Sequence, residues 1–153
     1  MQFRMSACVA AMMLAVAGST AIAQNENVTT PEDLDRVMKK AQPAMQATQK
    51  AMGSGAYADA RAQLATVRQA VEESQQFWVE KKREDALKMN RDTLAKIEAL
   101  DKLLAAGSIE PATATAALKE VGGACRSCHQ KYRATDSDDN YIIKPGSLEE
   151  KTQ

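Results

Sequence analysis

The strongest constraint on the fold is a group of three residues near the end of the chain, Cys125, Cys128 and His129. In a helix, positions 125 and 128 are neighbours on one face, because about 3.6 residues make one turn. Position 129 follows 125 by four residues and therefore lies over the same face. Apolar residues continue this face at spacings of three and four, which indicates a final amphipathic helix with both cysteines on its buried side. The series is Ala114, Leu118, Val121, Cys125, Cys128 and Tyr132.

The spacing Cys-x-x-Cys-His is the attachment sequence of a c-type haem. Its two thiols add to the vinyl groups along one edge of the porphyrin, and the imidazole binds the iron. A thioredoxin-like redox pair needs a βαβ setting, whereas this sequence predicts no strands. A structural zinc site needs four ligands, usually from two such pairs. We therefore predict one covalent haem c on Cys125, Cys128 and His129, with chance occurrence in a structural four-helix protein as the alternative.

The first 23 residues have the pattern of a secretory signal peptide. Arg4 supplies the positive start, residues 5–18 are mostly apolar and uncharged, and Ala21-Ile22-Ala23 is a small-x-small cleavage site. We expect cleavage after Ala23 and export to the periplasm. An uncleaved N-terminal anchor is the alternative, although the apolar run is short for a transmembrane helix.

The mature chain of 130 residues, 153 less the 23 of the leader, has the length of one domain. Removal of Arg4 leaves 19 basic against 20 acidic residues, which gives a net charge of −1. This balance is not the footprint of a nucleic-acid-binding protein, and no basic cluster suggests a membrane surface. The sequence therefore predicts neither a nucleic-acid partner nor a membrane span in the mature chain.

Helix start and stop signals divide the mature chain into four helices. The first begins at Thr30–Pro31, with a capping residue before a proline, and ends at Gly53–Gly55. A second begins near Ala56, and the break before the third falls somewhere in residues 74–83; one long helix is the alternative. Gly107 closes the third, and the fourth starts at Glu110–Pro111. The predicted fold class is an all-α, antiparallel four-helix bundle with haem attached near the end of the last helix.

We expect residues 24–134 to form the haem domain and residues 135–153 a polar C-terminal tail. Asp136, Asp138 and Asn140 resemble the start of a calcium loop, but the glycine and the closing glutamate of such a loop are missing. We reject that interpretation. Residues 141–143 either pack back on the bundle or remain disordered with the rest of the tail.

His129 is the only histidine in the chain, so two histidines cannot bind one iron within a single subunit. The other face of the iron is left to a methionine, a lysine, a small ligand or nothing. Met38, Met45 and Met52 lie on one face of the first predicted helix, but methionine at such positions commonly fills gaps in a core. These alternatives imply different functions. A thioether ligand gives a low-spin haem suited to electron transfer, whereas an iron with an empty sixth position binds gases.

The last helix resembles that of the class II c-type cytochromes, the cytochrome c-prime family. Residues 122–133 match the haem-binding helix of that family closely, and the resemblance extends over residues 31–134. Met38-Lys39, followed by Met45, is similar to the first helix of the low-spin members, in which the methionine of a Met-Lys pair is the sixth iron ligand. The resemblance thus implies that His129 is the proximal and Met38 the distal axial ligand.

The function that the resemblance implies is electron transfer by a small periplasmic monohaem cytochrome. Its partners would be redox proteins of the periplasm, met through a small and transient interface, and many members of the family form homodimers. The chain shows no acid–base constellation beside the haem motif, so we do not expect an enzyme. Arg133 is a candidate contact for a haem propionate. The alternative function is binding of nitric oxide or carbon monoxide at an open sixth site.

Overall fold

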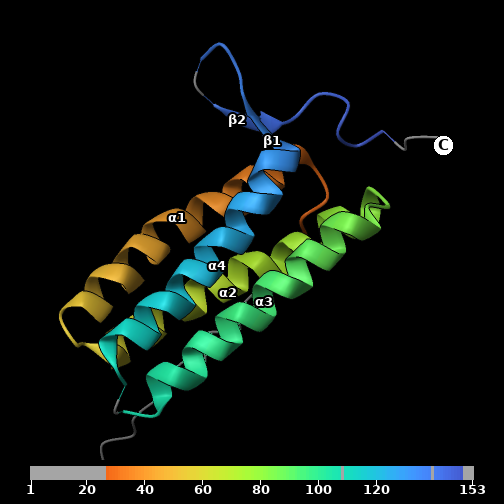
Figure 1. Cartoon of the computed structure of the whole chain (residues 1–153). Coiled ribbons are helices and arrows are strands. Elements are labelled where there is room, and N and C mark those ends of the chain that lie inside the picture. Colours follow the sequence, from red (N-terminus) through yellow and green to blue (C-terminus); the bar gives the residue numbers. More distant parts are fainter. Residues whose placement is uncertain (1–26, 108, 139, 150–153) are drawn as a thin grey trace, which may run out of the picture.

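The computed structural model describes residues 27–107, 109–138 and 140–149, and the predicted signal peptide lies outside these residues. Four helices dominate the fold, and short connections make each helix antiparallel to the one before it (Figure 1). The predicted all-α four-helix bundle is confirmed. The helices are α1 Pro31–Gly53, α2 Tyr57–Glu80, α3 Glu84–Ala105 and α4 Pro111–Tyr132.

Local chemistry explains the helix ends that the sequence predicted. Thr30 and Asp33 form a capping box, in which each side chain binds the backbone N–H of the other, and Pro31 occupies the first turn. Pro111 likewise opens α4. Proline also occurs inside α1, where Pro43 cannot donate a helical hydrogen bond to the carbonyl of Lys39, yet the helix continues past it.

The break between α2 and α3 is a tight turn within the predicted range. Lys82 adopts the left-handed conformation there, with φ of 52°, although it is not a glycine. The N–H groups of Lys81 and Arg83 donate to carbonyls in the last turn of α2, which closes that helix. The chain therefore has two separate helices here, and not one long helix.

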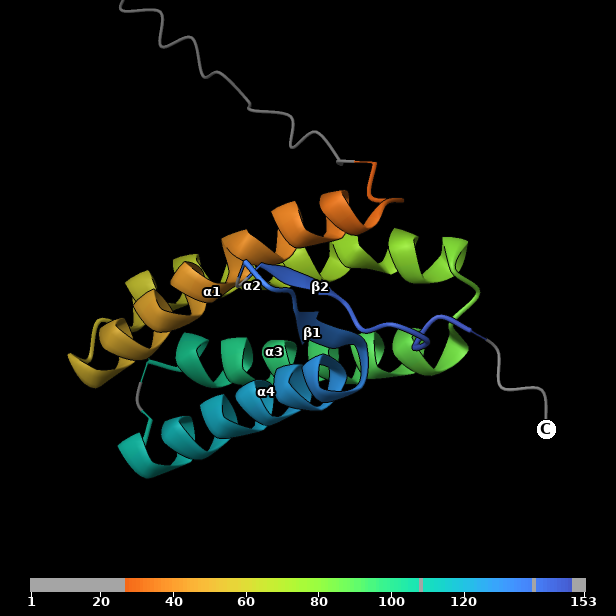
Figure 2. The same cartoon turned by 90° about the horizontal axis from the view of Figure 1, so that it is seen from above.

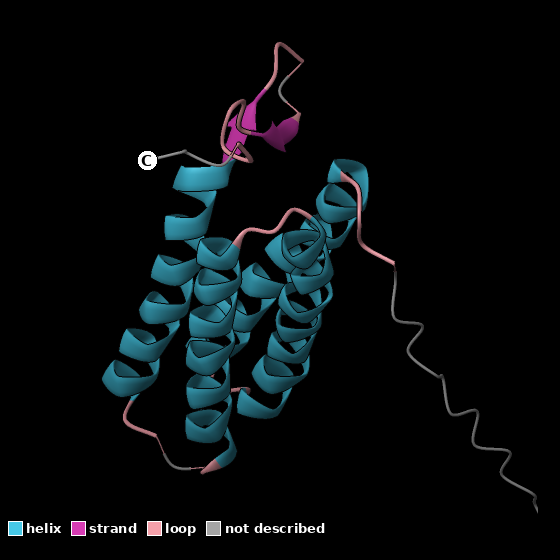
Figure 3. Ribbon diagram, turned by 90° about the vertical axis from the view of Figure 1, so that its right-hand side faces the viewer, coloured by secondary structure: helices cyan, strands magenta, loops and turns pink. Residues whose placement is uncertain are grey.

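A small antiparallel sheet follows α4, which the sequence analysis did not predict. Strand β1, Arg133–Thr135, continues directly from α4 and pairs with β2, Tyr141–Ile143. Residues 141–143 thus pack back on the bundle, as one of our two alternatives for the tail proposed. Figure 3 shows the two strands at one end of the four helices.

Consecutive helices pack against each other, but α1 and α4 do not form a comparable interface. Seen from above, α1 and α4 lie on opposite sides, with the two strands between them (Figure 2). Strand β2 contacts α1, so the sheet connects these two helices at one end of the bundle. No helix among the described residues has the length and apolar character needed to cross a bilayer.

Candidate functional site

The apolar core consists of two clusters arranged along the bundle. One contains Trp78 and Tyr132 near the two strands, and the other contains Leu64 and Ile97 further along. Cys128 packs against the first cluster and Cys125 against the second. The Cys-x-x-Cys-His segment therefore lies where the core is divided.

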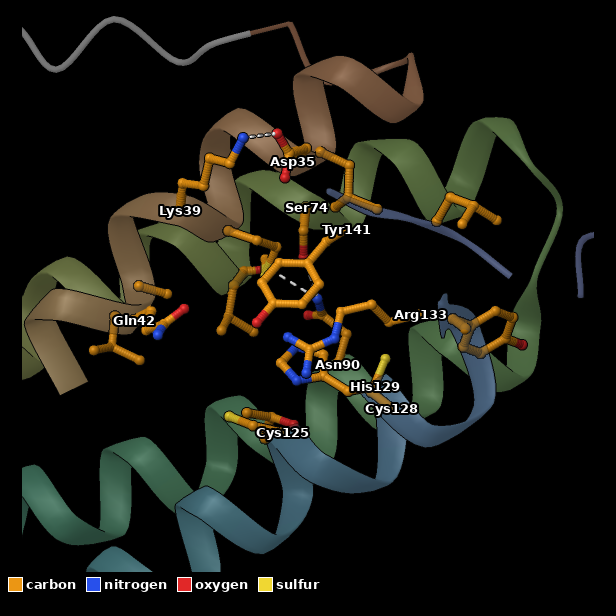
Figure 4. Close-up of a pocket in the computed structure, with 18 of the residues that line it drawn as sticks. Asp35, Lys39, Gln42, Ser74, Asn90, Cys125, Cys128, His129, Arg133 and Tyr141 are labelled. Carbon is orange, nitrogen blue, oxygen red and sulfur yellow. Dashed lines mark hydrogen bonds and ion pairs between the residues drawn. The ribbon is translucent and has the colours of Figure 1, made fainter. Parts of the chain in front are cut away.

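A cavity of about 430 Å³ opens at this division, between α1 and α4. Figure 4 shows Cys125, Cys128 and His129 on the wall that α4 forms. Side chains from α1 form another wall, and α2 and α3 contribute the floor. Apolar groups that line the cavity include Leu34, Met38, Ala41, Met45, Val67, Val71 and Trp78.

The two cysteines are free thiols, half-buried at the cavity wall. Burial raises the pKa of Cys125. Burial, followed by the neighbouring Cys125 and Asp85, raises the pKa of Cys128 to about 11. A catalytic Cys-x-x-Cys pair has the opposite shift, because its chemistry needs a thiolate at neutral pH. The local environment therefore disfavours the thioredoxin-like interpretation.

His129 is half-buried and lines the same cavity. Burial, and then the positive charge of Arg133, lower its pKa below the ordinary value of 6.5. The imidazole is consequently neutral at pH 7 and keeps a lone pair for a metal ion. Within the described residues, no three His, Cys, Asp or Glu side chains are grouped so that they could hold a metal ion by themselves. The described residues therefore offer no set of ligands for a structural zinc ion.

Two of the three methionines on the inner face of α1 line the cavity. Met38 and Met45 are half-buried there, one beside each core cluster, whereas Met52 packs only against the second cluster. Lys39 also reaches the cavity, but its ammonium lies 2.6 Å from the carboxylate of Asp35. Met38 and Met45 thus line the same cavity as His129, and each carries a thioether.

The floor of the cavity carries polar side chains that the sequence analysis did not single out. Asn90 donates to the carbonyl of Val71 and to the hydroxyl of Ser74, and Ser74 in turn donates to Val71. Thr93 donates to the carbonyl of Met89. These donors are used within the protein, so the floor is polar but satisfied. Ser74 lies on α2 and Asn90 on α3. The sequence alone does not identify them as neighbours, because their contact depends on how the two helices pack.

A hydrogen-bonded cluster fixes the last turn of α4, and thereby His129 one turn earlier. The hydroxyl of buried Tyr132 donates to Asp85 over 2.5 Å, and Lys131 and Arg83 form ion pairs with the same carboxylate. Burial of Asp85 opposes its ionisation, but these three partners outweigh burial and lower its pKa. The end of α4 is therefore tied to the turn between α2 and α3.

Arg133 lies at the mouth of the cavity, where its guanidinium stands 4.1 Å from the ring centre of Tyr141. Tyr141, Ile142 and Ile143 also line the cavity, although the sequence analysis assigned them no role in the site. Their run of aromatic and β-branched residues is the signal that favours a strand. Comparisons with protein-family models, with curated proteins and with solved structures each found no match.

Proposed function

We propose that the protein is a monohaem c-type cytochrome that transfers single electrons. The observation that carries the proposal is the meeting of four groups in one cavity: the thiols of Cys125 and Cys128, the imidazole of His129 and the thioether of Met38. The cysteines would hold haem c covalently, and His129 and Met38 would be its axial iron ligands. When bound, the haem supplies the one-electron chemistry of its iron.

The size and lining of the cavity support a large apolar occupant. The cavity opens to solvent and its lining is mostly apolar. Without an occupant these apolar side chains stay in contact with water, whereas covering them contributes about 25 cal/mol per Å² of apolar surface. A bound apolar ligand would therefore stabilise the fold. The volume also lies within the range of cofactor sites.

The chain's own residues favour an electron carrier over a gas-binding protein. Two thioethers line the wall on α1, and a thioether ligand stabilises reduced iron and a low-spin state. The donors of Ser74, Asn90 and Thr93 are already used, so these side chains are not poised to hydrogen-bond a gas molecule. Binding of nitric oxide or carbon monoxide remains the second candidate, because much of the cavity lining is apolar and offers no iron ligand.

The proposal includes export to the periplasm after cleavage at Ala23 and transient contact with redox proteins there. It also includes the resemblance to the low-spin class II cytochromes, on the grounds of residues 122–133 and Met38. No acid–base pair carries out a reaction in this scheme, so the proposed protein is not an enzyme.

Visible spectra of the purified protein, oxidised and reduced, test the proposal. We expect wild type to be low-spin with thioether-to-iron features, and Met38→Ala to lose them. Met45→Ala is the matched control, because Met45 lines the same wall on the same helix and should leave the features intact. Loss in Met45→Ala alone would reassign the ligand. A high-spin wild type that binds carbon monoxide rapidly would favour the gas-binding candidate instead.

A further inference from the structure

The C-terminal strands span the mouth of the cavity. Strand β1 extends from α4, and β2 pairs with it and contacts α1, the helix on the other side of the mouth. Several contacts hold the segment in place. The N–H of Lys144 donates to the carbonyl of Tyr132 over 2.7 Å, and Ile143 and Leu148 pack against the first core cluster. Arg83 donates to the carbonyl of Glu149. The strands are thus a built part of the site and not a loose tail.

Arg133 and Tyr141 meet at this mouth as the first residues of the two strands. The guanidinium carbon lies over the tyrosine ring, 4.1 Å from its centre, and Figure 4 labels both side chains at the cavity. Arg133 is exposed, lines the cavity and makes no ion pair with any described residue. Lys39, the other cation of the lining, is already paired with Asp35. Arg133 is therefore the lining cation whose charge still lacks a counter-ion.

A porphyrin of the haem type carries two carboxylates, which cannot be left in an apolar cavity without a partner. They must lie towards an opening, and an arginine there binds a carboxylate through two parallel hydrogen bonds. A guanidinium held over a ring needs less ordering for such bonds than a freely moving one. Tyr141 supplies that ring and, being 43% exposed, leaves the mouth accessible.

We propose that Arg133 and Tyr141 form a carboxylate clamp at the cavity mouth, in which Arg133 binds one carboxylate of the cofactor and Tyr141 is the positioning residue for Arg133. This inference rests on the proposed function. It gives the C-terminal strands a role. The antiparallel register pairs Arg133 with Ile143 and Thr135 with Tyr141, so residues 133 and 141 are diagonal neighbours on one face, within reach of long side chains. Only the ring face of Tyr141 is required, and not its hydroxyl.

Resonance Raman spectroscopy of the haem-loaded protein tests the clamp, because the propionate bending vibration reports hydrogen bonding to the carboxylates. We expect this band to shift towards weaker hydrogen bonding in Arg133→Gln and, to a similar extent, in Tyr141→Ala. Tyr141→Phe keeps the ring and should retain the wild-type band. Ile142→Ala is the matched control, because Ile142 is the next residue of the same strand, also lines the cavity and carries no polar group.

Three results would overturn the clamp while the proposed function stands. A wild-type band in haem-loaded Arg133→Gln would show that Arg133 binds no carboxylate. A shift in Arg133→Gln with none in Tyr141→Ala would show that Tyr141 does not position it. An equal shift in Ile142→Ala would also contradict the inference, because it would trace the effect to strand packing. Failure of wild type to carry haem would overturn the proposed function and the clamp together.

Discussion

Filling the cavity with protein should stabilise the haem-free chain. Ala41 lies between Met38 and Met45 on α1 and lines the cavity, half-buried. A phenylalanine at this position would place its ring in apolar space. We propose to make Ala41→Phe in a chain that also carries Cys125→Ser and Cys128→Ser, so that no haem can be attached.

The magnitude follows from burial and helix propensity. Full burial of a phenylalanine side chain contributes about 1.5–3 kcal/mol. The lower helix propensity of phenylalanine relative to alanine removes roughly 0.5 kcal/mol. We therefore expect the free energy of unfolding of the serine variant to rise by about 1–2 kcal/mol. In the chain with both cysteines, the same ring should compete with the cofactor and lower the yield of haem-loaded protein.

Urea unfolding followed by far-ultraviolet circular dichroism measures this free energy. Ala62→Phe is the matched control, because Ala62 is an exposed position of α2 outside the cavity. It should lower the stability by roughly 0.5 kcal/mol, from propensity alone. If Ala41→Phe destabilises the serine variant by about 1 kcal/mol or more, the site is already packed and the reasoning from an open cavity is wrong.

Three further predictions concern the ends of α1 and α4. Tyr132→Phe removes the hydroxyl that donates to Asp85 and should lower the free energy of unfolding by about 1–3 kcal/mol, measured in urea. Burial, and then the bond to Asp85, raise the pKa of Tyr132 to about 12. Its neutral form is therefore favoured in the folded state, and the stability should be present below pH 10 and fall as pH rises from 10 towards 12. Tyr132→Phe should show a smaller fall in that window, and equal falls in both proteins would contradict the assignment. Thr30→Ala removes the cap of α1 and should cost about 1 kcal/mol in the same urea experiment, whereas no loss would mean that the cap is dispensable.

Helix ends could be predicted where local chemistry determines them. Thr30 with Pro31, the glycines at 53 and 55, and Pro111 each act on the residues beside them, and all three boundaries are confirmed. The break before α3 could be placed only within a range. Lys82 takes the left-handed conformation without being a glycine, so no local residue type marks this turn. Contacts of Arg83 and Asp85 with Tyr132, far along the sequence, help to hold it.

The inward faces of the helices could likewise be predicted, but the shape of the space between them could not. Periodicity placed Met38, Cys125 and Cys128 on inner faces, and the structure shows them lining one cavity. Periodicity does not reveal that α1 and α4 are separated, because the distances between helices depend on how the whole core packs. Tyr141 reaches the mouth through pairing between β1 and β2, and short strands of this kind leave only a weak signal in sequence.

The state of the two thiols in the exported protein tests the account most directly. The full chain, with its leader, would be produced in bacteria that attach c-type haem, purified under denaturing conditions and measured by intact mass spectrometry, with an alkylating reagent to count free thiols. We predict a chain that begins at Gln24, is heavier by one haem, and has no thiol left to alkylate. A chain without added mass, in which Cys125 and Cys128 both react with the reagent, would contradict the central claim that this cavity holds a covalent haem.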